Sequence, residues 1–193
     1  STVKECYDLI LSDLDFADQN LPEENGVYAT KWAAKALKAR IYLDLNDYAK
    51  AAQFAGEVIN SNRFTLLDSL NRFTTGPNSE QIFVTVSTNS LNDDRSGVFL
   101  NYRSDNNPNP TMRANSAFHA FMTEDTTDLR GKNWFNLIEV GGNTTYGVSR
   151  FDRTFMWIPQ LHLTEMKLTR AEALAALNSD PSTALIDLND IRN

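Results

Sequence analysis

Hydrophobic residues recur at helical spacing on both sides of a short polar turn in residues 30–60. On each side the apolar positions follow one another every three or four residues, which predicts two antiparallel helices. Asn46 and Asp47 interrupt the pattern, and Asp47 is expected to cap the second helix. Many of the apolar positions are alanines. Small residues on facing stripes let helix backbones approach closely, as in tetratricopeptide-type pairs.

A similar pattern recurs 132 positions later in the chain. The spacing predicts a second helix–turn–helix unit, with Pro159 near the start of its first helix and Asp180 or Ser182 near the cap of the next. Identical residues at this offset support the repeat: Lys35 and Lys167, Ala39 and Ala171, Leu45 and Leu177, Asn46 and Asn178, Ala52 and Ala184, and Ile59 and Ile191.

Residues 1–20 also have helical spacing. Thr2 and Glu5 fit a capping box at the start of this predicted helix. Cys6 lies on it and is expected to be a half-buried core thiol. As the single cysteine, it excludes an internal disulfide and a CxxC site.

The segment between the two helix pairs has a different character. Residues 81–87 alternate between apolar and polar, which predicts a strand, and residues 88–111 form a long polar loop of a kind that is often functional or mobile. A short helix is predicted over 114–124, with Phe118 and Phe121 facing inward. Residues 130–147 resemble a strand and hairpin.

These patterns predict a mainly α fold of tetratricopeptide-like helix pairs, with a loop-rich insertion that contains a little β structure. The predicted domains are a helical part at 1–67, the insertion at 68–156, and a second helix pair at 157–193, truncated at its C-terminus. The insertion is the candidate ligand-binding part.

Charge and hydropathy exclude several classes of partner. The net charge of −7 and the pI of about 4.8 argue against nucleic acid and anionic lipid, because both require a basic surface. No segment approaches the ~20 apolar residues that a membrane-spanning helix needs.

Catalysis finds little support in the sequence. Glu165 and Glu172 share a predicted helix face, but seven residues separate their Cα atoms by roughly 10.5 Å. Glycosidases place their two carboxyl groups about 5–5.5 Å or about 6.5–9.5 Å apart. We therefore expect these glutamates to pair with Arg40, Arg170 or Arg192, and we predict that the protein is not an enzyme.

No cofactor or metal site is predicted either. The two histidines, His119 and His162, lack a further ligand at zinc spacing. Oxygen donors gather in the long loop, but the donor order and the glycine of an EF-hand are absent, so a calcium ion there is the weaker alternative to a solvated loop. These donors are Asp93, Asp94, Asp105, Asn106 and Asn107.

Aromatic residues with polar neighbours make the insertion the candidate ligand site. An exposed ring matches the apolar C–H face of a sugar, while amide and charged groups bind its hydroxyls. Ile158 and Pro159 directly after Trp157 favour a structural role for that ring, but it stays among the candidates. The predicted ligand-binding residues are Asn101, Tyr102, Arg103, Asp105, Trp134 and Trp157.

Four segments resemble the SusD/RagB family of outer-membrane nutrient-binding lipoproteins. Two positions depart from the family pattern: His162 stands for the usual arginine, and Lys167 for the usual aromatic residue. The matching segments are AAKALKARIYLDLNDYAKAA, the run Asn78-Ser79-Glu80-Gln81-Ile82-Phe83, Phe121 with Asp128-Leu129-Arg130, and IPQLHLTEMKLTRAEALAALN followed by ALIDLNDIRN.

The resemblance implies a surface-exposed, non-hydrolytic protein of the cell outer membrane that captures oligosaccharide. Such proteins sit as a lid on a SusC-like TonB-dependent transporter, which the helices mainly contact. Membrane attachment is expected only through a lipid anchor that is absent from this chain. The alternative is a helical-repeat scaffold for a peptide or protein, which would gather its exposed aromatics in a concave helix groove.

Overall fold

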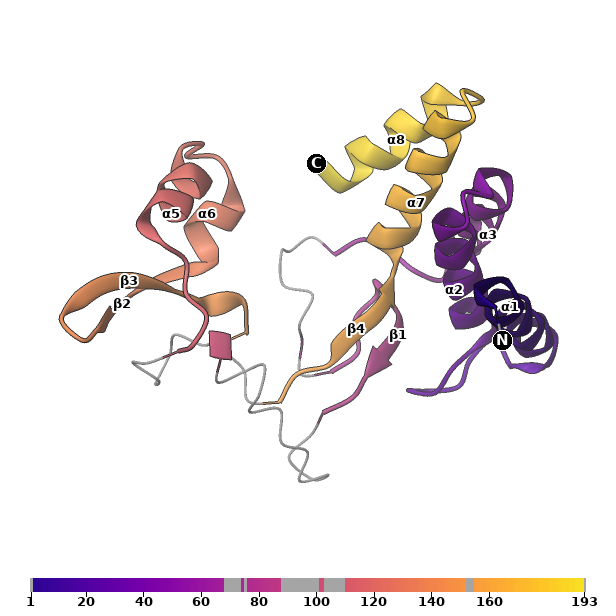
Figure 1. Cartoon of the computed structure of the whole chain (residues 1–193), viewed down its shortest axis with the longest axis horizontal. Coiled ribbons are helices and arrows are strands. Elements are labelled where there is room, and N and C mark those ends of the chain that lie inside the picture. The colour runs from indigo at the N-terminus through magenta and orange to yellow at the C-terminus, as the bar shows by residue number, and fades with distance from the viewer. Residues whose placement is uncertain are drawn as a thin grey trace. The chain divides into compact units, whose positions relative to one another are not determined.

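The protein was analysed as a computed structural model and divides into two compact units (Figure 1). We call the first the helical unit; it comprises Ser1–Leu67, Asn78–Thr85 and Pro159–Asn193. The second, the insertion unit, comprises Asp68–Pro77 and Val86–Ile158. The structure describes residues 2–67, 74, 76–87, 101–102, 110–151 and 155–192.

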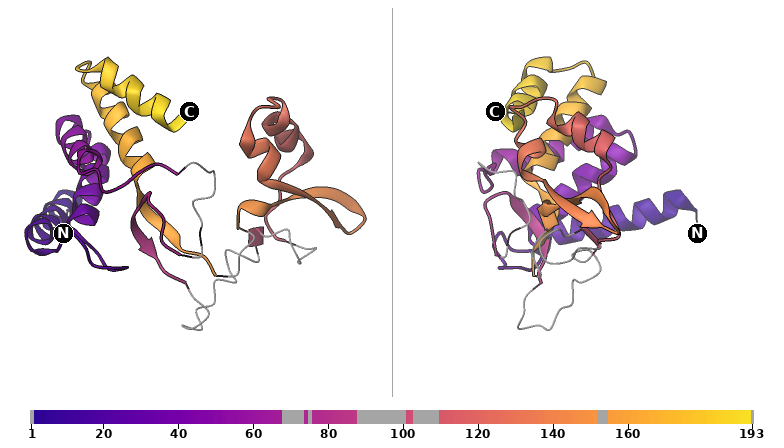
Figure 2. Two further views of the ribbon diagram at one scale, coloured as in Figure 1. Left: turned by 180° about the vertical axis from the view of Figure 1, so that it is seen from behind. Right: turned by 90° about the vertical axis from the view of Figure 1, so that its left-hand side faces the viewer.

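Five helices form the helical unit in the described part of the chain. They pack in the order in which they occur, α1 on α2, α2 on α3, α3 on α7 and α7 on α8, as Figures 1 and 2 show. The predicted mainly α, tetratricopeptide-like fold is confirmed. The helices are α1 (Val3–Asn20), α2 (Lys31–Asp44), α3 (Tyr48–Asn60), α7 (Leu163–Ala176) and α8 (Pro181–Arg192).

Small side chains dominate the core of this unit. Alanines of α2 and α3 are almost completely buried, which lets these helices approach closely. Met166 of α7 is the largest fully buried residue of the core cluster. The cluster consists of Ala33, Ala36, Ala39, Ala55, Val58, Ile82, Leu161 and Met166.

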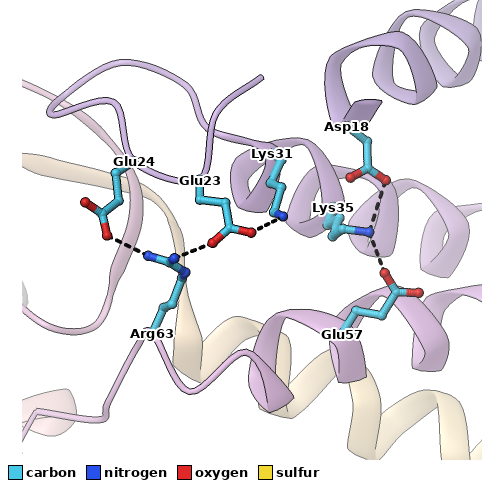
Figure 3. A network of polar contacts seen from close by, with 7 residues as sticks. All are labelled: Asp18, Glu23, Glu24, Lys31, Lys35, Glu57 and Arg63. Atoms are coloured by element: carbon cyan, nitrogen blue, oxygen red, sulfur yellow. Dashed lines mark hydrogen bonds and ion pairs between the residues drawn. The ribbon is translucent and has the colours of Figure 1, made fainter. Parts of the chain in front are cut away.

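The predicted helix starts are confirmed for α1 and α3. Thr2 and Glu5 form the capping box of α1, and the Asp47 side chain accepts a hydrogen bond from Lys50 N at 3.3 Å. Ion pairs of Lys35 on α2 then join this helix to both neighbours: its Nζ lies 3.1 Å from Asp18 of α1 and 2.5 Å from Glu57 of α3 (Figure 3).

The predicted repeat is also confirmed. Helices α2 and α7 begin and end at equivalent positions under the offset of 132. Each ends at a leucine in helical conformation, and the following residue, Asn46 or Asn178, has a positive φ of 59° or 50°. Asparagine tolerates this left-handed conformation better than most residues, so the identical turns have a physical reason.

A two-stranded sheet of β1 (Gln81–Thr85) and β4 (Ile158–His162) adjoins the helices. The predicted strand is confirmed, but the prediction that Pro159 begins a helix is wrong. Pro159 lies in β4, and α7 begins only at Leu163, where His162 Nδ1 accepts a hydrogen bond from Glu165 N at 3.3 Å. Pairing with β1, some 75 residues away, keeps this segment extended.

The insertion unit contains a hairpin and two short helices. They are α5 (Ser116–Thr123), α6 (Leu129–Asn133), β2 (Phe135–Val140), β3 (Asn143–Val148) and the 3-10 turn η2 (Ser149–Phe151). Strands β2 and β3 are antiparallel, with Phe135 opposite Val148. Gly141 and Gly142, with φ of 58° and 80°, form the turn. The predicted short helix is confirmed. The predicted strand and hairpin region is confirmed from Phe135 onward, whereas residues 130–133 belong to α6.

Three expected burials are wrong. Phe118 and Phe121 of α5 are 49% and 70% exposed, and Cys6 is exposed on α1. The inward face of α5 is set by other residues: His119 stacks on Tyr146 of β3, and the backbone of Met122 lies against α6. Helix α5 has eight residues, which make just over two turns. A pattern this short does not determine which face of the helix is buried.

Candidate ligand-binding site

Trp134 lies where α6 meets β2. Its N–H donates to Arg130 O at 3.0 Å, and its carbonyl accepts from Ser149 N at 2.9 Å, so both backbone groups are fixed. The Arg150 guanidinium carbon lies 4.6 Å from the ring centre. This cation–π contact covers part of a half-buried ring. A ligand could therefore contact only the part of the Trp134 ring that Arg150 does not cover.

The helix before Trp134 is fixed by its acidic cap. Asp128 accepts from Arg130 N at 2.8 Å and pairs with the Arg130 guanidinium at 2.6 Å. The hydrogen bond from the Arg130 guanidinium contributes most, and the one from the Arg130 backbone comes next. Together they lower the pKa of Asp128, so its carboxylate stays ionised. Gly131 lies so close to Met122 O that a Cβ atom would be only 2.1 Å away. The backbone that carries Trp134 is thus tightly positioned.

The two described residues of the other predicted cluster differ in exposure. Asn101 is exposed, and its carbonyl accepts from Met112 N at 2.8 Å, while Tyr102 is half-buried. Arg103 and Asp105 lie outside the described residues, as do all the loop residues proposed for calcium. Their predicted roles stay predictions.

Trp157 is held by a backbone bridge immediately before β4. Its N–H donates to Thr74 O at 2.7 Å. The ring is half-buried, and its Nε1 is buried without a hydrogen-bond partner among the described residues. Asn101, Tyr102, Trp134 and Trp157 belong to the same unit. The contacts described above tie Asn101, Trp134 and Trp157 each to different neighbours.

A ring cluster in this unit was not predicted. The His119 ring stacks on Tyr146 at 3.7 Å between centroids, with 6° between the planes, and meets Phe135 edge-on at 5.5 Å. Phe118 meets the same Phe135 at 6.0 Å. The hairpin could have suggested Phe135 and Tyr146, but their contact with α5 depends on tertiary packing that no spacing encodes.

The described residues offer little for metal binding or for acid–base chemistry. No group of three or more potential ligands is arranged for a metal in the part of the chain that the structure describes. Glu165 pairs with Arg40, with oxygen–nitrogen distances of 2.6 and 2.8 Å, which confirms its expected structural role. In the same described part, no helix is long and apolar enough to span a membrane.

Comparison with known proteins found similar sequences and similar structures. A SusD-like family model, described as "Starch-binding associating with outer membrane", matches residues 1–43. The SusD-like protein P38 of Formosa agariphila is 36% identical over 67 residues, which is 34% of this chain and 13% of that protein. The match to the family model covers α1 and all but the last residue of α2, the helices joined by Asp18 and Lys35.

Solved structures match almost the whole chain. A SusD superfamily protein from Bacteroides thetaiotaomicron has a TM-score of 0.81 at 26% identity, with 99% of this chain and 47% of that one covered. A SusD-like carbohydrate binding protein from Bacteroides vulgatus has a TM-score of 0.76 at 18% identity, covering 100% and 43%. The chain thus has the SusD-type architecture of helix pairs with an insertion. It resembles SusD-like proteins, and it spans a little under half the length of these two solved structures.

Proposed function

We propose that this protein is a non-catalytic, oligosaccharide-binding component of an outer-membrane nutrient-uptake complex, working with a SusC-like TonB-dependent transporter. The observation that carries the proposal is the SusD-type fold across 99% of the chain. The family description as starch-binding, and the carbohydrate-binding name of the second relative, support a sugar as the ligand. Surface exposure at the outer membrane is part of the same proposal.

Trp134 is the proposed centre of the site. Its backbone is fixed on both sides and Asn133 and Asn136 flank it, so a rigid ring is presented beside amide groups. Arg150 packs on the ring without blocking every approach. A rigid aromatic surface loses little conformational entropy on binding, and neighbouring amides supply hydrogen bonds to hydroxyls. Asn101, Tyr102, Arg103, Asp105 and Trp157 remain further proposed contacts.

Titration calorimetry with neutral oligosaccharides, beginning with maltoheptaose, tests the proposal. We expect a Kd between micromolar and millimolar, and we expect Trp134→Ala to weaken binding at least about tenfold, because an aromatic sugar platform is lost. Phe121→Ala is the matched control: it removes an exposed ring of the same unit that lies outside the predicted site. Far-UV circular dichroism confirms that both variants remain folded.

The outcomes separate the alternatives. Equal losses in the two variants would move the site from Trp134 to a broader aromatic surface. Absence of heat with every glycan, together with capture of a basic peptide, would overturn the proposal in favour of a peptide-binding scaffold.

A further inference from the structure

A pocket in the helical unit is lined by none of the residues proposed above. It has a volume of about 350 Å³, within the range of about 300–1,000 Å³ for small-molecule sites. We call it the helix-end pocket. Its walls come from the loop 23–26, the first turn of α2 with Trp32, the segment after α3 with Arg63 and Phe64, and the start of β1 with Gln81.

Charges at the pocket neutralise one another. Glu23 accepts hydrogen bonds from both Lys31 and Arg63, and Arg63 Nη1 also donates to Glu24 at 2.9 Å (Figure 3). The hydrogen bonds from Lys31 and then Arg63 lower the pKa of Glu23. Two carboxylates and two cations therefore leave no net charge to attract an ion. A neutral ligand fits this wall better than an anion or a cation.

Two hydrogen-bond donors of the pocket have no partner in the part of the chain that the structure describes. Trp32 Nε1 and Gln81 Nε2 are buried, and neither finds an acceptor among the described residues. The amide of Gln81 is oriented by Asn78 N, which donates to its Oε1 at 3.1 Å, so the NH₂ group is the free end. Buried donors are rarely left unpaired in folded proteins. Both residues line the same pocket, which points to one acceptor-rich occupant.

We propose that the helix-end pocket binds a single neutral sugar residue whose hydroxyl oxygens accept hydrogen bonds from Trp32 Nε1 and Gln81 Nε2. Hydroxyls suit the site because they also donate, and the Glu23 and Glu24 carboxylates on the wall accept. Both nitrogens are buried, so binding includes a small rotation of each side chain toward the pocket. The choice of a sugar rests on the proposed function, whereas the pocket and its two donors do not.

The test follows indole and side-chain amide signals of the ¹⁵N-labelled full chain during titration with methyl α-D-glucopyranoside. Trp→Phe variants at 32, 134 and 157 assign the three indole signals. We expect the Trp32 indole and Gln81 amide signals to shift and to saturate in the millimolar range. Gln81→Glu retains the acceptor for Asn78 N but loses the donor, and should weaken binding about fivefold.

Two further variants guard against a folding artefact. Trp32→Phe removes the second donor without breaking any hydrogen bond within the described protein, and should also weaken binding, followed through the Gln81 amide. Ser87→Ala deletes a buried hydroxyl of the other unit that also has no partner among the described residues, and should leave affinity at the helix-end pocket unchanged.

Failure of this inference is distinguishable from failure of the proposed function. Shifts confined to Trp134 or Trp157 would overturn the helix-end pocket and support sugar binding in the insertion. Saturable shifts at Trp32 with none at Trp134 would support the pocket and count against the proposed insertion site. Linear, non-saturating shifts, or none at any indole, would overturn the pocket.

Discussion

Asp187 of α8 has no exposed side-chain surface and neutralises two cations of α7. It accepts from Arg170 Nε at 2.6 Å and Nη2 at 2.8 Å, and from Lys167 Nζ at 3.2 Å. Lys167 stands where the resembled family pattern has an aromatic residue, and in this structure it contacts Asp187. The lysine binds Asp187 and also Asp190, at 2.7 Å.

Removing the charge of Asp187 should strongly destabilise the helix pair. We expect Asp187→Asn to lower the free energy of unfolding by about 3 kcal/mol, because the buried Lys167 and the half-buried Arg170 lose their shared anion. Asp190→Asn is the control: its side chain is 47% exposed, so the loss should be below about 1 kcal/mol. Urea denaturation of both variants measures the difference, and equal losses would contradict the role of burial.

Asp180 should make stability depend on acidic pH. Hydrogen bonds from the Thr183 side chain and backbone, and from the Ser182 hydroxyl, lower the pKa of Asp180 from an ordinary 3.8 to about 2. Because the folded-state pKa is the lower one, the contribution is complete above about pH 4 and is lost as the pH falls toward 2.

Thermal unfolding of the wild type and Asp180→Asn between pH 5 and pH 2 tests this. The variant keeps an acceptor oxygen for the cap but cannot titrate. We expect the wild type to lose more thermal stability than the variant between pH 4 and pH 2. Parallel losses would show that Asp180 does not titrate in that window.

At the scale of elements, close approach of α5 and α6 depends on Gly131. A Cβ atom there would meet Met122 O at 2.1 Å, a backbone atom that cannot move alone. We expect Gly131→Ala to destabilise the insertion unit by several kcal/mol, because one helix must separate from the other. Hydrogen exchange of the β2 and β3 amides would report the loss.

Gly56→Ala is the matched control for this substitution. Gly56 lies within α3, and the added Cβ would meet Arg170 Cδ at an ordinary 3.8 Å. Alanine also has the higher helix propensity, so this variant should be neutral or slightly more stable. A loss similar to that of Gly131→Ala would contradict the steric explanation.

At the scale of the molecule, the net charge of −7 separates a sugar ligand from a basic peptide. Binding of a neutral oligosaccharide should change less than about twofold between 50 and 500 mM salt, because it depends on no long-range attraction. A cationic peptide attracted by an acidic surface should lose affinity several-fold over that range. Calorimetry at both salt concentrations distinguishes them, and a steep loss with the oligosaccharide would contradict a neutral binding mode.

The sequence by itself determined the five helices of the helical unit, the caps of α1 and α3, and the repeat, but not the residue at which α7 begins. Apolar spacing, the capping box at Thr2 and the cap at Asp47 are local features, and local hydrogen bonds form them. The offset of 132 reproduced α7 from α2, because Asn46 and Asn178 support the same left-handed turn. The resemblance to the SusD/RagB family could also be recognised from the sequence, because the segments that carry it coincide largely with these helices and turns.

Only the tertiary structure decided the rest. Pro159 is in a strand because β1 supplies a distant pairing partner, and α5 turns His119 inward because Tyr146 lies there to receive it. Sequence identified the aromatic candidates, but not that Arg150 would cover part of Trp134, nor that Trp32 and Gln81 would line one pocket. Such contacts join residues tens of positions apart, and their energies depend on packing that no local pattern contains.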